Sequence, residues 1–243
     1  MKLDGKRILV TGATGGIGGA LAQTLRARGA AVIVHGRDHA RLDKFARNGF
    51  EVVESRLDDH GAAEALVQRV LAVGPLDILI NNAGVQEQLD FRSTDVESQL
   101  TSIDRELDVN LRAPVVLTRL LLPTLLARPV AAVVNITSGL ALVPKQSAPV
   151  YCATKAALHS FSTTLRWQLE GTSVDVFEAL PPLVDTAMTR GRDKGKISPE
   201  QCAREIVHGL ERDRHTILIG KTALLAILVS MAPFIARRIM RHG

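Results

Sequence analysis

Short apolar runs alternate with helical patterns along most of this chain. We expect strands at residues 8–10, 32–34, 51–55, 78–80, 131–138, 173–180 and 216–220. The three-to-four-residue period of helices appears from residue 17 and at 40–48, 62–71, 96–126 and 153–169. This alternation predicts a doubly wound α/β fold of three layers, with a parallel seven-stranded sheet. Ligands of such folds bind where the strands end.

A glycine-rich turn, TGATGGIG at residues 11–18, follows the first strand and opens the first helix. Gly12 permits a tight turn, and Gly16 and Gly18 let the main chain approach a ligand. The helix N-terminus then offers free N–H groups to a pyrophosphate. The spacing Gly-x-x-x-Gly-x-Gly differs from the commoner Gly-x-Gly-x-x-Gly. Because a strand and a helix flank the turn, we favour nucleotide binding over a merely structural turn.

Arg37 follows the second strand, where such folds meet the adenosine ribose. An acidic residue there would bind the ribose hydroxyls and repel a 2′-phosphate. A guanidinium instead can hold a 2′-phosphate through charge-assisted hydrogen bonds. We therefore favour NADP(H) as the cofactor. NAD(H) stays open, because Arg37 could equally stack on the adenine.

Tyr151 and Lys155 are four residues apart, so they share one helix face. A neighbouring ammonium lowers the pKa of a phenol below its free value of about 10 and suits it to proton transfer. Ser138 precedes the pair in a loop and could bind the same substrate oxygen. By itself the Tyr-x-x-x-Lys spacing also fits an ordinary exposed helix face. Asn110, in the middle of a predicted helix, is mildly unfavourable there and calls for a reason.

The composition narrows the class of protein. Of 243 residues, 46% are hydrophobic and only 3% aromatic, which suits a parallel sheet with a core of small aliphatic residues. The net charge is +5, but no Lys/Arg runs with interleaved aromatics occur, so we expect no nucleic-acid partner. Cys152 and Cys202 lack metal-ligand spacing, and we expect no metal site. The opening MKLDGKRILV has no signal-peptide core, which favours the cytoplasm.

Together these motifs resemble the short-chain dehydrogenase/reductase family in its basic single-domain form. The pieces are TGATGGIG at 11–18, NNAG at 81–84, Asn110 in DVNL, Ser138, and YCATK at 151–155. They come in the family's order and at its spacing, over about residues 5–220. The resemblance implies a Rossmann-type fold and NAD(P)-dependent hydride transfer between a carbonyl and an alcohol. It also implies a homodimer or homotetramer.

The family's functional residues carry over to matching positions. The resemblance implies Tyr151 as acid/base, Lys155 as the group that lowers its pKa and binds the nicotinamide ribose, Ser138 as the group that orients the substrate oxygen, and Asn110 as the holder of a relay water. The implied cofactor-binding residues are Gly12, Thr14, Gly15, Gly16, Ile17, Gly18, Arg37, Asn82, Ala83, Gly84, Asn110, Tyr151, Lys155, Val184 and Thr186. Residues that could form the subunit interface, or equally the core, are Leu120, Leu121, Phe161, Leu165 and Trp167.

Three positions depart from the family pattern. Pro181-Pro182 replaces the usual Pro-Gly after the sixth strand, and a proline fixes φ and removes an N–H. Arg56 stands where the family often has an Asp that meets the adenine, which adds positive charge near the expected 2′-phosphate. The segment 186–198, where the substrate lid usually grows, is short and polar. We therefore expect either an open site or one covered by another part of the chain.

The C-terminal tail, residues 221–243, follows a dehydrogenase domain that we place at 1–220. Its apolar residues recur at helical spacing, at Leu224, Leu228, Met231 and Ile235. Pro233 suits the first turn of a second helix. The apolar stretch is shorter than the roughly 18 residues expected of a membrane span.

Three interpretations of the tail stay open. It packs on the body or at a subunit interface, it lines an apolar substrate pocket, or it rests on the inner membrane face with its arginines near anionic headgroups. The arginines are Arg237, Arg238 and Arg241. Our leading hypothesis is an NADP(H)-preferring oxidoreductase with an apolar substrate. The rival is a nucleotide-binding protein with a docking tail and little productive catalysis.

Overall fold

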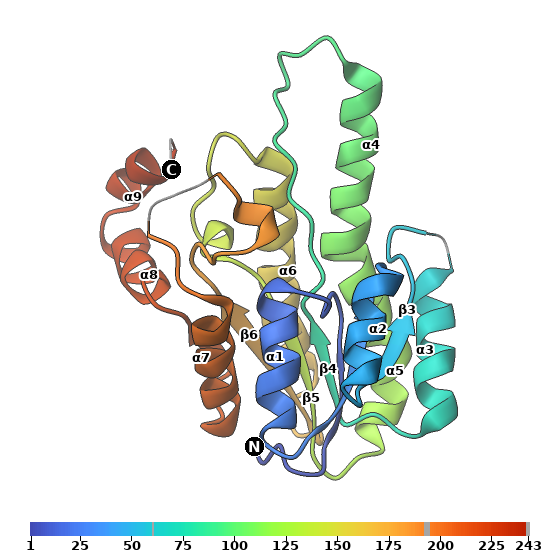
Figure 1. The fold of residues 1–243 in the computed structure, drawn as a ribbon. Coiled ribbons are helices and arrows are strands. Elements are labelled where there is room, and N and C mark those ends of the chain that lie inside the picture. Colours follow the sequence, from blue (N-terminus) through green and yellow to red (C-terminus); the bar gives the residue numbers. More distant parts are fainter. Residues whose placement is uncertain (60, 192–194, 242–243) are drawn as a thin grey trace.

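The structure is a computed structural model that describes residues 1–59, 61–191 and 195–241. Seven parallel strands form one sheet in the order β3-β2-β1-β4-β5-β6-β7 (Figure 1). The strands are β1 (Arg7–Val10), β2 (Ala31–Gly36), β3 (Glu51–Glu54), β4 (Ile78–Asn81), β5 (Ala131–Ile136), β6 (Val174–Leu180) and β7 (Thr216–Leu218). This sheet confirms the predicted fold. The order reverses at β1, between β2 and β4, which is where doubly wound folds bind their ligands.

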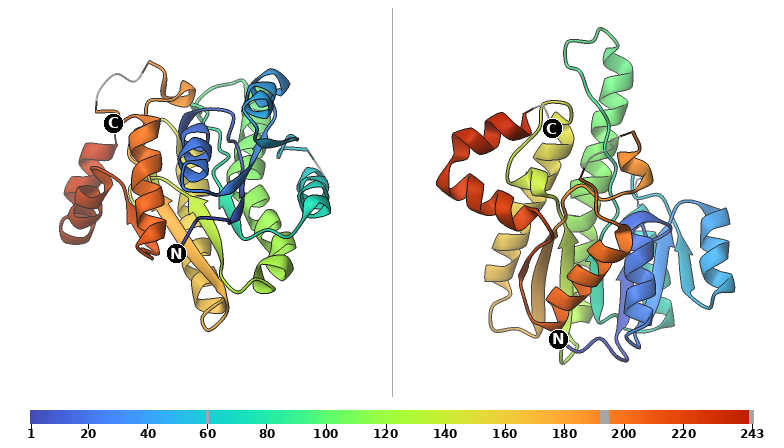
Figure 2. Two further views of the ribbon diagram at one scale, coloured as in Figure 1. Left: turned by 60° about the horizontal axis from the view of Figure 1, so that its bottom comes forward. Right: turned by 60° about the vertical axis from the view of Figure 1, so that its left-hand side comes forward.

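Helices cover both faces of the sheet, as the views of Figure 2 show. One face carries α1 (Gly16–Arg26), α2 (His39–Arg47) and α7 (Pro199–Glu211). The other carries α3 (Ala62–Val73), α5 (Ala113–Leu126) and α6 (Pro149–Gln168). Along β1, Ile8 and Val10 belong to the first core and Leu9 to the second, because successive strand residues point to opposite faces. Burying each such side chain stabilises the fold by about 1.5–3 kcal/mol.

The predicted helix at 96–126 is three elements in the structure. α4 (Val96–Leu107) rises beyond the strand ends (Figure 1), a π-helical turn (Asp108–Arg112) follows, and α5 continues. By length and composition this run could cross a membrane. Leu117, Leu121 and Leu125, however, are fully buried in the second core, as expected of a core helix.

Two helices differ from the prediction. α6 begins at Pro149, four residues before its predicted start, so Tyr151 and Lys155 both lie on it. α7 was not predicted at all. Its N-terminus is capped by Ser198, whose side chain accepts from the N–H of Gln201, and Cys202 and Ile206 are fully buried against the sheet. Within the polar segment 186–198, residues 192–194 lie outside the described residues.

The C-terminal hairpin, α8 (Thr222–Met231) and α9 (Pro233–Met240), projects from the side of the molecule (Figure 2). Pro233 starts the second helix, as predicted. Leu225 lies against Gly139, because a Cβ on that glycine would come 3.4 Å from Leu225 Cδ2. The main-chain N–H of Gln146 donates to the carbonyl of Arg241 at 3.2 Å. The hairpin therefore borders the segment 138–148 that follows β5.

Candidate active site

The glycine-rich turn and the NNAG loop, residues 81–84, are packed main chain to main chain. Gly12 has φ +63, and a Cβ there would come 2.7 Å from Cα of Ala83. A Cβ on Gly18 would come 2.4 Å from Nδ2 of Asn82. The Thr11 hydroxyl accepts from the N–H groups of Asn82 and Ala83, each at 3.0 Å. The two loops therefore form one rigid edge above β1 and β4.

The N-terminus of α1 is open to an anion. Gly15 is its N-cap and no side chain caps it, so the first N–H groups have no side-chain acceptor from the described chain. Gly36, at the end of β2, lies against the turn, since a Cβ there would come 2.4 Å from Cγ2 of Thr14. The turn, the open helix end and the end of β2 thus fit a dinucleotide, with main chain available for its pyrophosphate.

Arg37 is exposed just beyond β2 and makes no hydrogen bond or ion pair with any part of the chain that the structure describes. Arg41, which the sequence reading overlooked, lies closer to the turn. Its NH1 would be 3.6 Å from a Cβ on Gly15, and its Nε pairs with Asp38 at 3.1 Å. The charge of Arg56 is offset by Asp58 at 2.9 Å. Arg37 is therefore a free cation at this edge among the described residues, and Arg41 is a second cation nearer the turn, paired with Asp38.

His35, on β2, supports the turn from below. It is buried, and burial lowers its pKa to about 4. Its Nδ1 accepts from the N–H of Gly12 at 3.3 Å, so its Nε2 carries the proton and faces Ser55 Oγ at 3.0 Å. The imidazole is therefore neutral at physiological pH and acts as a structural support.

Asn110 lies fully buried in the π-helical turn. Its Oδ1 accepts from the N–H of Val85 and its Nδ2 donates to the carbonyl of Val85, both at 2.8 Å. A Cβ on Gly84 would come 3.3 Å from Asn110 Oδ1 and 3.7 Å from Lys155 Nζ. This gives a physical reason for the asparagine that the sequence pattern flagged: it fixes the end of the NNAG loop beside Lys155.

Lys155 is buried, and its Nζ donates to the carbonyl of Ile136 at 2.9 Å. Burial lowers its pKa to about 8, and the charge of Glu178 opposes that shift. The same Nζ lies 5.7 Å from the centroid of the Tyr151 ring. Ser138 follows β5 two residues after Ile136, and its Oγ accepts from the N–H of Leu140 at 3.1 Å. Tyr151, Lys155 and the end of β5 thus converge at the strands' carboxyl edge.

The loop after β6 closes the edge on a third side. Thr186 lies against the glycine-rich turn, since a Cβ on Gly16 would come 3.1 Å from Thr186 Cγ2. Val184 is buried and pairs with Ile197 in a short bridge. The carbonyl of Pro181 accepts from the N–H of Gly139 at 2.9 Å, so the Pro181-Pro182 path is tied to the segment after Ser138. The family positions Val184 and Thr186 therefore lie at the expected edge.

Other side chains of interest play no visible part in this edge. Cys152 and Cys202 are buried, and burial raises the pKa of both thiols. No cluster of three metal-ligating side chains occurs among the described residues. Of the residues suggested for a subunit interface, Leu121 and Leu165 belong to the core, whereas Trp167 is 64% exposed. Sequence reasoning also missed Glu178, a buried carboxylate near Lys155.

Comparisons with known proteins agree with this geometry. The family model described as short chain dehydrogenase matches residues 6–196. An uncharacterized oxidoreductase of Bacillus subtilis (strain 168), DltE, is 42% identical over 226 residues, which cover 89% of each chain. A short chain dehydrogenase from Burkholderia cenocepacia J2315, solved in complex with NADP, is 25% identical, with complete coverage of both chains (100%) and a TM-score of 0.88.

A third relative is a 3-oxoacyl (acyl-carrier-protein) reductase from Agrobacterium tumefaciens C58, solved with NADP bound. It is 30% identical, with a TM-score of 0.74, and the match covers 83% of this chain and 86% of that one. The family model spans most of the sheet, both loops of the nucleotide edge and the Tyr151–Lys155 pair. The chain therefore belongs to the short-chain dehydrogenase family of NAD(P)-dependent oxidoreductases.

Proposed function

We propose that the protein is an NADP(H)-preferring oxidoreductase that interconverts a carbonyl and an alcohol, with Tyr151 as the acid and base. The surroundings of Lys155 carry this proposal. Its ammonium binds the end of β5 through Ile136, lies near the Tyr151 ring, and adjoins Gly84 of the NNAG loop. The Lys155 ammonium thus lies where three parts of the site meet: the end of β5 before Ser138, the proposed acid/base Tyr151, and the nucleotide edge.

Bound nicotinamide supplies or accepts the hydride at the substrate carbon. In the reducing direction the Tyr151 hydroxyl donates its proton to the substrate oxygen, and in the oxidising direction the tyrosinate takes that proton back. The Lys155 ammonium stabilises the tyrosinate by its charge. Ser138 donates a hydrogen bond to the same substrate oxygen and so fixes its position.

Asn110 supports the proton relay indirectly. Its Oδ1 accepts from Val85, and its Nδ2 donates to the carbonyl of Val85 and to the Thr154 hydroxyl, so we assign the relay water to main-chain atoms of the π-helical turn rather than to the side chain. Such turns inside α-helices occur frequently at functional sites. The amide keeps the NNAG loop and the turn in register beside Lys155.

The preference for NADP(H) rests on Arg37 and Arg41. A 2′-phosphate at the end of β2 would meet the unpaired guanidinium of Arg37, and Arg41 borders the same turn. No acidic side chain stands at the position of Arg37 to repel it. Two of the solved relatives, from Burkholderia cenocepacia and Agrobacterium tumefaciens, were solved with NADP.

An apolar substrate suits the segment 138–148 and the hairpin beside it. Leu140 and Leu142 are half-buried in that segment, and Leu225 of α8 lies against Gly139. The hairpin thus takes the place of the short segment 186–198 as a wall near Ser138. We place residues 1–220 in the catalytic domain and assign the tail, 221–243, the role of this wall.

The decisive experiment compares the protein with its Tyr151→Phe variant. The variant loses only the phenolic hydroxyl, so it should bind NADPH with unchanged affinity by calorimetry. Its turnover should fall at least about a hundredfold, because a positioned general acid usually accelerates a reaction by about that factor or more. Turnover is measured as NADPH oxidation across a panel of apolar ketones and aldehydes. Turnover near that of the unaltered protein would refute the assignment of Tyr151.

A second candidate function, docking of the protein on an anionic membrane surface, rests on the hairpin. Leu224, Met231 and Phe234 are 70%, 81% and 82% exposed. Arg237 and Arg238 are exposed on α9, and the tail holds no Asp or Glu. An apolar helix face with flanking arginines fits an anionic lipid interface.

Flotation with vesicles that contain anionic lipid tests this docking. The full chain should float, and a Met231→Ser/Phe234→Ser variant should stay in the dense fraction. A matched control, Val73→Ser/Phe91→Ser, alters exposed apolar residues elsewhere and should float like the unaltered protein. If none of the three proteins floats, the hairpin does not dock on membranes.

We also propose a homodimer or homotetramer formed through α4 and α6. Val96 and Leu100 are exposed on α4 and Trp167 on α6, outside the two cores. Large exposed apolar residues of this kind are typical of subunit interfaces. Light scattering after size exclusion would give the mass, and Trp167→Glu should shift it toward the monomer.

A further inference from the structure

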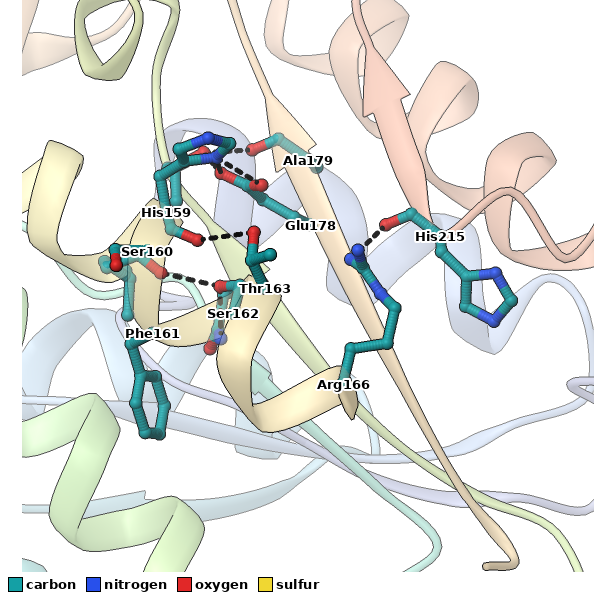
Figure 3. Close-up of polar contacts among 12 residues, drawn as sticks. His159, Ser160, Phe161, Ser162, Thr163, Arg166, Glu178, Ala179 and His215 are labelled. Atoms are coloured by element: carbon teal, nitrogen blue, oxygen red, sulfur yellow. Dashed lines mark hydrogen bonds and ion pairs between the residues drawn. The ribbon is translucent and has the colours of Figure 1, made fainter. Parts of the chain in front are cut away.

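A buried polar cluster lies one helical turn beyond Lys155 (Figure 3). Its centre is Glu178 on β6, whose side chain is 1% exposed. The Glu178 Oε1 accepts from the Thr137 hydroxyl at 2.6 Å, and Oε2 faces Nδ1 of His159 at 2.8 Å. Figure 3 shows the imidazole of His159 reaching from α6 to this carboxylate. Burying a carboxylate costs free energy of folding unless hydrogen bonds or an opposite charge compensate it, and here Thr137 and His159 supply the hydrogen bonds.

Each partner of Glu178 leads to the reaction centre. Thr137 directly precedes Ser138, so the carboxylate anchors the strand end from which Ser138 projects. Lys155 lies four residues before His159 on the same helix face, and the charge of Glu178 acts on its ammonium. Through Glu178 the end of β5 and the proposed tyrosine–lysine face of α6 are held together.

The pair is also connected to solvent. The His159 side chain is 38% exposed, whereas Glu178 and Lys155 are buried. Glu178 raises the pKa of His159 mainly through the hydrogen bond, and partial burial and, to a smaller extent, the charge of Arg166 oppose that shift. Protons can therefore exchange between solvent and the cluster at His159 without passing the substrate.

We propose that Glu178 and His159 are positioning residues of the active site: Glu178 fixes Thr137 and supplies the negative charge that keeps Lys155 an ammonium, and His159 sets how much of that charge Lys155 feels. The proposal rests on the function proposed above. When His159 is protonated, its imidazolium offsets the carboxylate. When it is neutral, Lys155 feels the full negative charge.

The charged and titratable groups around this cluster are few among the described residues. Glu178 on β6 is the charge that acts on Lys155, and His159 faces Glu178 from α6. Arg166, on the same helix, acts on His159 and donates to the carbonyls of Val176 and His215. The Thr137 hydroxyl and the carbonyl of Ile136 carry no charge, and the titratable phenol of Tyr151 lies on the same helix face as Lys155. Removing the Glu178 charge therefore lowers the pKa of Lys155 further, because burial then acts unopposed.

The test is the pH profile of kcat/KM in Glu178→Gln, which keeps the shape of the side chain. Activity falls at alkaline pH where Lys155 loses its proton. That limb should move to lower pH by about one unit in Glu178→Gln, the size expected for a nearby opposite charge. His159→Gln keeps a hydrogen-bond donor for Glu178 and removes the imidazolium that can offset its charge, so its limb should not move to lower pH.

Thr137→Val separates geometry from charge, and Thr163→Val on α6 is the matched control. Thr137→Val should lower kcat without moving the limb, whereas Thr163→Val should change neither. If the alkaline limb of the kcat/KM profile lies at the same pH in Glu178→Gln as in the unaltered protein, the proposal is overturned, even if kcat falls. A merely structural role would lower kcat at every pH without moving the limb.

A second readout needs no substrate. In protein with isotope-labelled lysine side chains, the Lys155 resonance, assigned with Lys155→Arg, should titrate at lower pH in Glu178→Gln. If no carbonyl is reduced but this shift occurs, the proposed function fails and the electrostatic pair stands. If turnover is found and the Lys155 titration is unmoved, the pair fails alone.

Discussion

Asn110 binds both main-chain polar groups of Val85, its Oδ1 taking the N–H and its Nδ2 the carbonyl, each at 2.8 Å. A single side chain of the π-helical turn therefore satisfies both main-chain polar groups of Val85, a residue that lies beyond the end of β4. The contact also sets where Gly84 lies relative to Lys155. The asparagine is thus needed for the shape of the site before any part it has in proton transfer.

Asn110→Ala should destabilise the protein by about 2–5 kcal/mol, because two main-chain groups of Val85 lose their partners and each unmet buried group costs about 1–3 kcal/mol. Urea unfolding measures this loss. Asn110→Asp keeps the acceptor for the Val85 N–H but sets a carboxylate oxygen against the Val85 carbonyl in a buried position, so it should be at least as destabilised as Asn110→Ala. Equal stability of all three would show that water replaces the amide.

Gly12→Ala should abolish NADPH binding and destabilise the fold, because the new Cβ would press on Ala83 at 2.7 Å as well as strain a φ of +63. Gly49→Ala is the matched control, since Gly49 has φ +78 and nothing within 4 Å. It should lose only about 1 kcal/mol and bind NADPH normally. Calorimetric titration and thermal unfolding distinguish the two variants.

Arg37→Ala should weaken NADPH binding by about tenfold or more, the loss expected for one charge-assisted hydrogen bond, and leave NADH binding unchanged. Arg47→Ala removes an equally exposed arginine from the far end of α2 and should change neither affinity. Competition titrations with both cofactors measure the ratio. Equal affinities for NADPH and NADH that Arg37→Ala does not alter would exclude a 2′-phosphate role for Arg37.

His35 should make the fold sensitive to acid. Its folded pKa of about 4 lies below the unfolded value of 6.5, so the unfolded chain binds the proton more readily. The stabilisation is therefore complete above pH 6.5 and is lost as the pH falls toward 4, by about 3 kcal/mol in total.

Chemical unfolding at pH 7 and pH 5 checks this expectation. His35→Gln should be less stable at pH 7 but should lose less on acidification. His208→Gln, at an exposed histidine on α7, serves as the comparison and should lose stability on acidification as the unaltered protein does. A parallel loss in all three proteins would place the acid sensitivity elsewhere.

The sequence predicted the sheet, and it predicted that most of the candidate site residues lie at its carboxyl edge, because both depend on local signals. Strand runs, the Gly12–Gly18 turn and the Tyr151–Lys155 spacing are each readable within a short window. α7 was not predicted, although Ser198, Pro199, Cys202 and Ile206 give a capped amphipathic pattern.

Contacts distant in sequence could not be predicted in the same way. Glu178 and His159 are 19 residues apart and belong to a strand and a helix. Nothing in either local pattern distinguishes a buried carboxylate from an exposed one. The π-helical turn at Asn110 likewise depends on the fit of α4 and α5 around the NNAG loop, and no local residue preference specifies it.

The hydrogen bond from the Gln146 N–H to the Arg241 carbonyl links the segment after Ser138 to the C-terminal hairpin. The nucleotide edge is built from contacts among Thr11, Asn82, Ala83 and their glycines, and none of these residues touches the hairpin among the contacts described above. The wall near Ser138 is joined instead to the last helix of the chain. Under the proposed role of the hairpin, substitutions within residues 222–241 should change substrate choice while cofactor affinity stays constant.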